Sequence, residues 1–220
     1  METAILIPCL NEQTTIAEVV KGFSASIPEA AVYVYDNDST DSTAHVAREA
    51  GAIVRIEHAK GKGNVVRRMF AEIDADVYVL VDGDGTYDSS AVRGLVDLLQ
   101  GQNLDMVVAS RTSSGNRAGH AYGNRVFNCL YRWMFGAGFT DIFSGYRVFN
   151  RGFVKSFPAT SNGFEIETEM SVHASQLRLS TAEIETAYGT RPEGSKSKLR
   201  TFNDGLEILK AMIILLKENR

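Results

Sequence analysis

The chain has 220 residues, enough for one domain with a sizeable core. Its formal net charge of -4 excludes a general attraction to nucleic acid, so local basic clusters must hold any anionic substrate. Cys9 and Cys129 lack metal-ligand spacing and fit a reducing compartment better than a disulfide framework. Because the N-terminus lacks the pattern of a signal peptide and no apolar run is long enough to span a bilayer, we expect a cytosolic catalytic part.

Strand and helix patterns alternate through the first half of the chain. Short apolar runs predict strands over Ala4–Cys9, Ala31–Asp36, Ala52–Glu57, Asp76–Asp82 and Asp105–Ser110. Apolar residues at helical spacing predict helices over Thr14–Ser26, Ser42–Ala50, Asn64–Ile73 and Ser89–Gln100. This order predicts an α/β fold with a parallel sheet and right-handed crossovers.

The second half of the chain, after Arg111, is less regular. The expected elements are a loop over Ser113–Gly123, a helix over Asn124–Phe135, a strand over Tyr146–Phe149, a helix over Glu165–Gln176, a strand over Glu183–Ala187, a loop over Thr190–Arg200 and a helix over Phe202–Lys217. We predict a single domain over residues 1–220, because no linker or composition shift divides the chain.

One apolar run ends in two carboxylates, Asp82 and Asp84, with Gly83 between them. Both faces of the run Val77–Val81 are apolar, as in a parallel sheet between helix layers. Ligands of such sheets bind beyond the carboxyl ends of the strands. Two carboxylates this close repel each other unless a hard cation neutralises them, and Mg²⁺ typically joins such groups to substrate phosphates. The pattern therefore predicts a metal-dependent phosphate-ester site.

Polar residues also follow the first two predicted strands. Asn11 and Glu12 follow the first, and Asp36 and Asn37 close the second, so three strand ends would display acids and amides on one rim of the sheet. Asp36 could accept a hydrogen bond from a base or a ribose. The simpler alternative is helix capping, by Asn11 for the first helix and by residues 39–41 for the second.

The segment Lys60–Gly63 precedes the third predicted helix. Its glycines would let the backbone approach a ligand, and Lys62 could meet a phosphate or a ribose. The segment lacks the spacing of a P-loop, and a flexible basic loop without a ligand is an equally good explanation.

Taken together, these motifs resemble family 2 glycosyltransferases of the GT-A fold, in the branch of dolichyl-phosphate mannose synthases and polyprenyl-phosphate glycosyltransferases. The residues that carry the resemblance are Pro8, Asn11, Glu12, Asp36, Asn37, Ser39, Asp41, Lys60–Gly63, Asp82–Asp84 and Ser144–Arg147. The resemblance implies a Rossmann-like, mainly parallel sheet flanked by helices. Residues 1–110 would bind a nucleotide sugar, residues 111–200 would form the acceptor side, and residues 201–220 would form a C-terminal amphipathic helix.

By this resemblance the enzyme would be an inverting hexosyltransferase that uses UDP-sugar or GDP-mannose. Asp82 and Asp84 would hold Mg²⁺ or Mn²⁺ on the donor diphosphate, which needs a cation to leave readily. The implied nucleotide-binding residues are Pro8, Asn11, Glu12, Asp36, Asn37, Lys62 and Gly83.

The implied acceptor is a polyprenyl phosphate. Asp141–Arg147 resembles the family's acceptor segment, and the residues expected to bind phosphate are Arg111, Arg125, Ser144, Arg147, Arg191 and Lys196. The loop Arg191–Arg200 resembles one that folds over the donor diphosphate. A phosphate monoester is largely dianionic at pH 7 and needs no strong base. If a base acts, Asp141 is the candidate, with Glu165, Glu167 and Glu169 as runners-up that could equally be acids at a helix N-terminus.

The last predicted helix is amphipathic. Its apolar stripe could pack on the core, or it could bring the enzyme to the inner face of the membrane or to a membrane-protein partner; a homo-oligomer is also possible.

Other functions fit parts of the sequence. Asp82–Thr86 matches the nucleophile motif of haloacid-dehalogenase-type phosphatases, but these usually carry it on their first strand. A sugar-phosphate nucleotidyltransferase should have a Gly-rich basic N-terminal loop, which Ile7–Thr14 lacks. An inactive sugar-nucleotide-binding scaffold would not need both the metal-binding and the acceptor residues.

Overall fold

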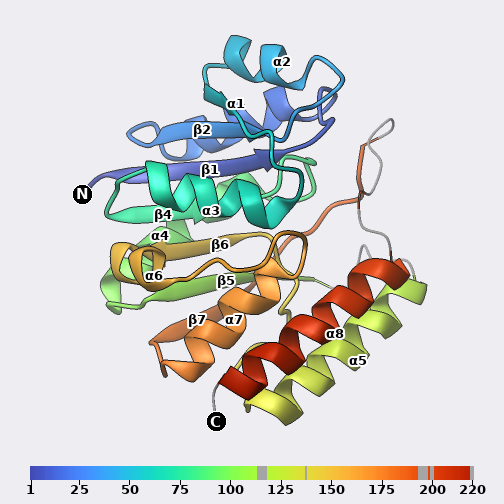
Figure 1. Cartoon of the computed structure of the whole chain (residues 1–220). Coiled ribbons are helices and arrows are strands. Elements are labelled where there is room, and N and C mark those ends of the chain that lie inside the picture. Colours follow the sequence, from blue (N-terminus) through green and yellow to red (C-terminus); the bar gives the residue numbers. More distant parts are fainter. Residues whose placement is uncertain (113–117, 137, 193–197, 199–200, 219–220) are drawn as a thin grey trace.

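The structure is a computed structural model that describes residues 1–112, 118–136, 138–192, 198 and 201–218. A seven-stranded sheet forms its centre, in the strand order β3-β2-β1-β4-β6-β5-β7 (Figure 1). The strands are β1 Thr3–Cys9, β2 Ala31–Asp36, β3 Ile53–Ile56, β4 Val77–Leu80, β5 Met106–Arg111, β6 Arg147–Asn150 and β7 Thr181–Thr186. In the described sheet only β6 runs antiparallel to its neighbours, β4 and β5. The predicted α/β fold with a mainly parallel sheet is confirmed.

Helices cover both faces of this sheet. They are α1 Ile16–Ser26, α2 Thr43–Glu49, α3 Lys62–Glu72, a short 3-10 helix η1 Ser89–Ala91, α4 Val92–Gly101, α5 Ala118–Phe135, α6 Arg151–Ser156, α7 Ile166–Gln176 and α8 Thr201–Glu218. One apolar core joins the sheet to α1, α2 and α4, and a second joins the other face to α3, α6 and α7. Helices α5 and α8 lie side by side beyond α7 and complete the second core (Figure 1).

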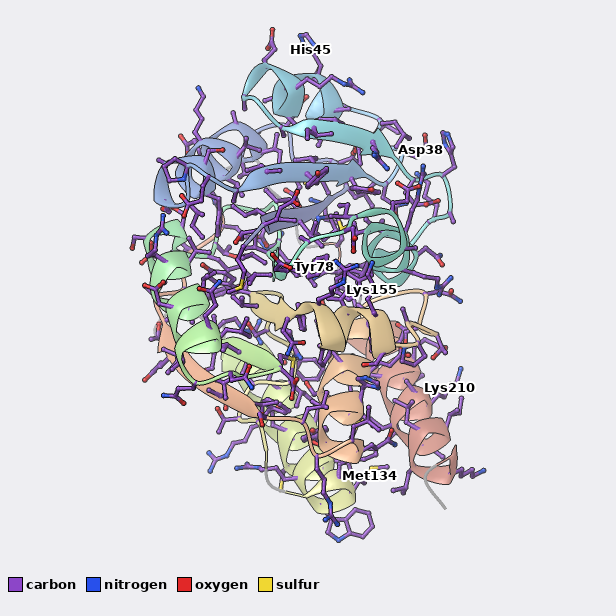
Figure 2. All side chains as sticks on the ribbon, turned by 90° about the vertical axis from the view of Figure 1, so that its left-hand side faces the viewer. Asp38, His45, Tyr78, Met134, Lys155 and Lys210 are labelled. Atoms are coloured by element: carbon purple, nitrogen blue, oxygen red, sulfur yellow. The ribbon has the colours of Figure 1, made fainter. Side chains whose placement is uncertain are left out.

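Strand β4 is covered on both faces, as its apolar residues predicted. Val77, Val79 and Val81 pack in the core with α1 and α4, whereas Tyr78 and Leu80 pack in the core with α3. Tyr78 lies in the centre of the molecule with the ammonium group of Lys155 near its ring (Figure 2). The end of β4 is therefore a rigid base for the residues that follow it.

The structure changes the predicted boundaries in the second half. The loop expected over Ser113–Gly123 was wrong from residue 118 onward, because α5 begins at Ala118. Gly119 and Gly123 have low helix propensity, and the packing of α5 against α7 and α8 outweighs it. Helix α6 was not predicted; Asn150 caps it by accepting a hydrogen bond from the N–H of Phe153.

Candidate active site

The predicted rim of acids forms at one edge of the sheet. Strands β1, β2 and β4 run parallel, so their carboxyl ends lie together. Asn11 and Glu12 follow β1, Asp36 ends β2, and Asp82 and Asp84 follow β4. The prediction that three strand ends meet on one rim is confirmed.

Two residues predicted to bind the nucleotide, Asn11 and Asp36, make hydrogen bonds that hold the segments after β1 and β2 in place. The side chain of Asn11 does not cap α1; it accepts a hydrogen bond from the N–H of Thr40, 2.8 Å away. Asp36 is buried and accepts hydrogen bonds from the hydroxyl and the N–H of Ser39. Pro8 is a buried residue of β1. These contacts connect the segment after β1 to the segment after β2.

Asn37 fixes the basic loop before α3. Its amide donates to the carbonyls of Glu57 and Ala59, each at 2.8 Å, and its side-chain oxygen accepts from the N–H of Gly61, also at 2.8 Å. Asn37 is buried and all these groups are used within the protein. It therefore positions Lys60–Gly63 instead of presenting its amide to a ligand.

Lys62 lies between two carboxylates, those of Asp82 and Glu167. Its side chain is only 10% exposed and that of Glu167 only 5%. Burial alone would lower the pKa of Lys62, but the two carboxylates raise it, so the ammonium form is retained. Of the three acids proposed at the start of α7, only Glu167 meets this cluster; Glu165 and Glu169 accept hydrogen bonds from backbone N–H groups of residues 160–163.

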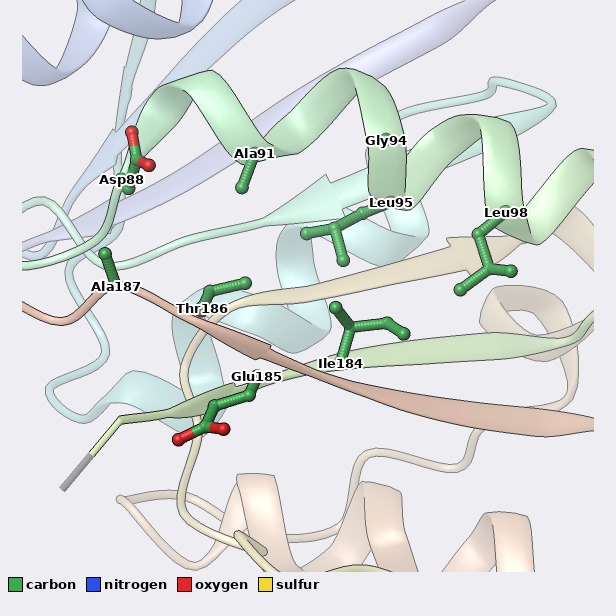
Figure 3. Close-up of a pocket in the computed structure, with 9 residues that line it drawn as sticks. All are labelled: Asp88, Ala91, Gly94, Leu95, Leu98, Ile184, Glu185, Thr186 and Ala187. Carbon is green, nitrogen blue, oxygen red and sulfur yellow. The ribbon is translucent and has the colours of Figure 1, made fainter.

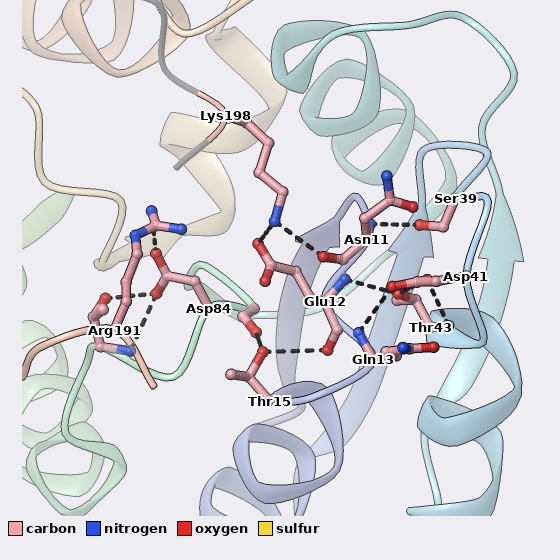
Figure 4. Close-up of polar contacts among 12 residues, drawn as sticks. Asn11, Glu12, Gln13, Thr15, Ser39, Asp41, Thr43, Asp84, Arg191 and Lys198 are labelled. Carbon is pink, nitrogen blue, oxygen red and sulfur yellow. Dashed lines mark hydrogen bonds and ion pairs between the residues drawn. The ribbon is translucent and has the colours of Figure 1, made fainter. Parts of the chain in front are cut away.

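Asp84 and Glu12 are paired with cations from the segment that follows β7 (Figure 4). One carboxylate oxygen of Asp84 accepts from the N–H and the hydroxyl of Thr86, and the other meets the guanidinium of Arg191 at 2.6 Å. Lys198 pairs with Glu12. Burial raises the pKa of Glu12, and Lys198 opposes that effect. The contacts join the beginning of the chain to its last third.

Gly145 brings the acceptor segment against Asp82. In the antiparallel ladder Leu80 pairs with Arg147, which sets Asp82 opposite Gly145 two residues further along. A Cβ atom on Gly145 would lie 2.3 Å from Oδ2 of Asp82, so the absence of a side chain lets this carboxylate keep its position. The N–H of Gly145 donates to the hydroxyl of Tyr87 at 2.8 Å, which fixes the approach.

Arg111 is held by Asp141 in a two-pronged ion pair. Nε and one terminal nitrogen of Arg111 each donate to a different oxygen of Asp141 at 2.7 Å, and the guanidinium lies 5.4 Å from the ring centre of Tyr188. Burial would raise the pKa of Asp141, but Arg111 lowers it below its usual value. Glu183 fixes the same turn by accepting from the N–H groups of Thr140 and Asp141. Asp141 is therefore a weak proton acceptor that orients Arg111.

The structure corrects the roles expected for Ser144 and Arg147. Arg147 is fully buried and donates to the carbonyls of Ile142 and Ser144 at 2.8 and 2.9 Å and to the hydroxyl of Ser171 at 3.0 Å. Ser144 is also fully buried and donates to the carbonyl of Ala109. The expectation that these two residues contact a phosphate was wrong, because their polar groups hold the turn over residues 141–147 together.

The remaining predicted phosphate-binding residues lie apart. Arg125 is exposed on α5. Arg191, which begins the loop expected to fold over the donor diphosphate, meets Asp84. Lys196 lies outside the described residues.

The donor atoms at the end of β4 fit a hard divalent cation. Asp82 and Asp84 provide carboxylate oxygens, the ligands that Mg²⁺ and Mn²⁺ prefer. Gly83 lets the segment between them pass close to β1, since a Cβ atom added there would lie 2.5 Å from Sγ of Cys9. Within the described residues no group of three or more His, Cys, Asp or Glu residues could hold a metal. The chain therefore fits a cation whose other ligands come from a substrate or from water.

A groove of about 460 Å³ lies away from this cluster, between α4 and β7 (Figure 3). Its lining is mostly apolar and consists of Asp88, Ala91, Gly94, Leu95, Leu98, Ile184, Glu185, Thr186 and Ala187. None of the paired acids and bases described above lines it.

Comparison with known proteins gives consistent matches. The family model described as "Glycosyl transferase family 2" matches residues 4–156. The "Glycosyltransferase AglJ" of Haloferax volcanii is 36% identical over 206 residues, which are 91% of this chain and 67% of AglJ. The "Dolichyl-phosphate hexose transferase" of the same organism is 26% identical over 226 residues, covering 100% of this chain and 96% of that protein. Glucosyl-3-phosphoglycerate synthase from Mycobacterium tuberculosis, solved with Mn²⁺, UDP-glucose and phosphoglyceric acid, has a similar fold, with a TM-score of 0.79, 21% identity and coverage of 98% of this chain and 80% of that chain.

Proposed function

Because this chain belongs to glycosyl transferase family 2, we propose that it transfers a hexose from a nucleoside-diphosphate sugar to a polyprenyl phosphate, with inversion and with bound Mg²⁺ or Mn²⁺. The GT-A fold implied by the motifs is confirmed by the sheet and by the structural match. Family membership makes the chain a glycosyltransferase, so the phosphatase and inactive-scaffold alternatives are set aside. The single observation that carries the proposal is the acidic pair at the end of β4, directly opposite Gly145 of the acceptor turn.

The donor would bind along the rim of β1, β2 and β4. Asp82 and Asp84 would hold the cation, which supplies charge neutralisation for the departing diphosphate. Glu12 follows β1 and Asp36 ends β2, and in this proposal their carboxylates would meet the ribose and the base. Lys62 provides a buried positive charge beside Asp82. The Mn²⁺ and UDP-glucose named for the structurally similar synthase support this donor class.

The acceptor would bind beside Arg111. Asp141 aligns the guanidinium, which suits a phosphate because it can donate two parallel hydrogen bonds. An oxygen of the polyprenyl phosphate would attack the anomeric carbon from the face opposite the diphosphate, and the nucleoside diphosphate would leave. A largely dianionic phosphate needs no general base, which agrees with the lowered pKa of Asp141. The name of the dolichyl-phosphate hexose transferase relative supports this acceptor class.

Helices α5 and α8 would bring the enzyme to the lipid acceptor at the inner face of the membrane. Their exposed apolar side chains include Val126, Trp133, Leu206, Ile213 and Ile214, and Trp133 is 81% exposed. A helix with apolar and aromatic residues on one side can lie in the plane of a membrane surface. None of the described helices has both the length and the hydropathy of a membrane span. A membrane-protein partner or a second copy are alternative occupants of this surface.

A transfer assay tests the proposal. The protein is incubated with radiolabelled UDP-sugars or GDP-mannose, Mn²⁺ or Mg²⁺, and a polyprenyl phosphate, and label is counted in the organic phase. We expect transfer from one donor, its loss on chelation, and a fall of at least about 100-fold in Asp84→Asn, a size typical of removing an electrostatic contact to the transition state. Arg93→Gln, which breaks an exposed ion pair with Glu29 elsewhere on the surface, is the matched control. No transfer from any donor by the folded protein would refute the proposed function.

A further inference from the structure

Three acids of the proposed donor site already have positively charged partners from this chain. Asp82 pairs with Lys62, Asp84 with Arg191, and Glu12 with Lys198. Buried carboxylates are costly without such compensation. A cation and a nucleotide that bind here therefore compete with the ion pairs that these carboxylates already form.

The three basic residues differ in how firmly they are held. Lys62 is buried and bonded to Glu167 as well as to Asp82, so it keeps a carboxylate partner if Asp82 binds something else. Arg191 and Lys198 are more accessible, with side chains 32% and 24% exposed. Both follow β7 in the chain, whereas Lys62 begins α3. Arg191 and Lys198 are thus the two that solvent and ligands reach more readily.

The geometry at Asp84 favours this exchange. Its side chain is 5% exposed. One oxygen accepts two hydrogen bonds from Thr86, and the other is in contact with Arg191 (Figure 4). A divalent cation at that oxygen would lie beside the Arg191 guanidinium, and repulsion between the two positive charges favours the departure of Arg191.

We propose that Arg191 is an internal counter-ion of Asp84 that changes partners when ligands bind. The divalent cation takes Asp84, and Arg191 moves to the phosphates of the nucleotide. Each charged group keeps a partner of opposite charge in this exchange. The cation replaces Arg191 beside Asp84, and the diphosphate replaces Asp84 beside Arg191. Lys198 makes the same kind of exchange at Glu12, without contact to Asp84. The inference rests on the proposed function for the identity of the ligands.

Such an exchange couples the two ligands. The cation releases Arg191 for the diphosphate, and the diphosphate draws Arg191 away from the site of the cation. Each ligand therefore increases the affinity of the other, and the two increases are equal by linkage. Arg191 sets the size of this coupling.

The experiment measures binding without turnover. Binding of Mn²⁺ alone is followed by the electron paramagnetic resonance signal of the free ion, and binding of UDP and of GDP by calorimetry with and without Mn²⁺. In Arg191→Gln we expect Mn²⁺ alone to bind about 5- to 10-fold more tightly, and the nucleoside diphosphate in the presence of Mn²⁺ to bind about 10-fold more weakly, a size within the usual range of coupling between two sites. Lys198→Gln should weaken nucleotide binding and leave the affinity for Mn²⁺ alone unchanged. Arg93→Gln, whose ion pair is also 2.6 Å long, should change neither quantity.

The outcomes separate the inference from the proposed function. If Asp84→Asn loses Mn²⁺ binding while Arg191→Gln binds Mn²⁺ as the wild type does or more weakly, the metal site stands and the counter-ion exchange is wrong. If Asp84→Asn binds Mn²⁺ like the wild type, the metal site and the inference both fail. Arg191→Lys retains the charge and should stay near the wild type in both assays. Thermal melting of each variant checks that it is folded, and an unfolded Arg191→Gln would be replaced by Arg191→Met, with the same expected changes.

Discussion

A single methyl group at Gly145 tests whether the contact between the donor and acceptor segments matters for catalysis. In Gly145→Ala the added Cβ atom would lie 2.3 Å from Oδ2 and 2.7 Å from Cγ of Asp82, whereas ordinary contacts begin at 3.4 Å. Gly145 has no positive φ, so alanine strains the site only through this clash. The carboxylate of Asp82 must therefore move by about 1 Å, away from Lys62 or out of the cation site.

The expected effect is large on turnover and small on stability. A misplacement of about 1 Å at a reacting site can lower the rate by about 100-fold, which corresponds to about 2.7 kcal/mol. The free energy of unfolding should fall by only about 1 kcal/mol, because the clashing atoms belong to the end of a side chain and alanine lowers the entropy of the unfolded chain.

Initial rates of label transfer as a function of Mn²⁺ concentration measure the first effect, and urea unfolding measures the second. The control is Gly94→Ala in α4, where a Cβ atom meets nothing within 4 Å. It should keep its activity and gain up to about 1 kcal/mol from the better helix propensity of alanine. A Gly145→Ala enzyme with kcat within twofold of the wild type would show that Asp82 need not occupy this position.

Three further outcomes follow from the same structure. Asp141→Asn should raise the KM for the polyprenyl phosphate about 10-fold and lower the free energy of unfolding by about 3 kcal/mol, because Arg111 loses its charged partner; an unchanged acceptor KM in steady-state kinetics would contradict this role. Arg68 is the main cause that lowers the pKa of Glu72 to about 2, from an ordinary value of 4.5, so the stabilisation by Glu72 is complete above pH 4.5 and is lost as the pH falls toward 2. In urea unfolding, the difference between the wild type and Glu72→Gln should therefore shrink over that interval, and a constant difference would be the contrary result. Trp133→Ala should weaken binding to anionic lipid vesicles by about 10-fold in sedimentation, and equal binding would argue against a membrane contact by α5.

The sequence predicts the acids of the rim because local rules place them. A continuous apolar run defines β4, the alternation of strands and helices makes β1, β2 and β4 parallel, and parallel strands end at the same edge. The common edge of Asp82 and Glu12 can therefore be predicted without information on long-range contacts. Their ion-pair partners cannot be predicted in this way.

The ion pairs across the site depend on tertiary geometry that periodicity does not contain. Glu167 meets Lys62 from a distant helix, and Arg191 meets Asp84 from beyond β7. The sequence indicates each of these residues as a candidate, but it does not predict the partner of any of them or its burial. Arg147 is the clearest example. An arginine in an acceptor motif suggests phosphate binding, but this side chain donates hydrogen bonds to backbone carbonyls in the core.

The reversed strand β6 limits how this enzyme can be recombined with its relatives. Because β6 pairs with β4 on one side and β5 on the other, a chimera joined between β5 and β6 would place one parent's strand inside the other parent's ladder. A register slip of one residue would replace Gly145 by a residue with a side chain opposite Asp82. Productive crossovers should therefore inherit the segments around Asp82 and Gly145 from the same parent, even though some sixty residues separate them in the chain.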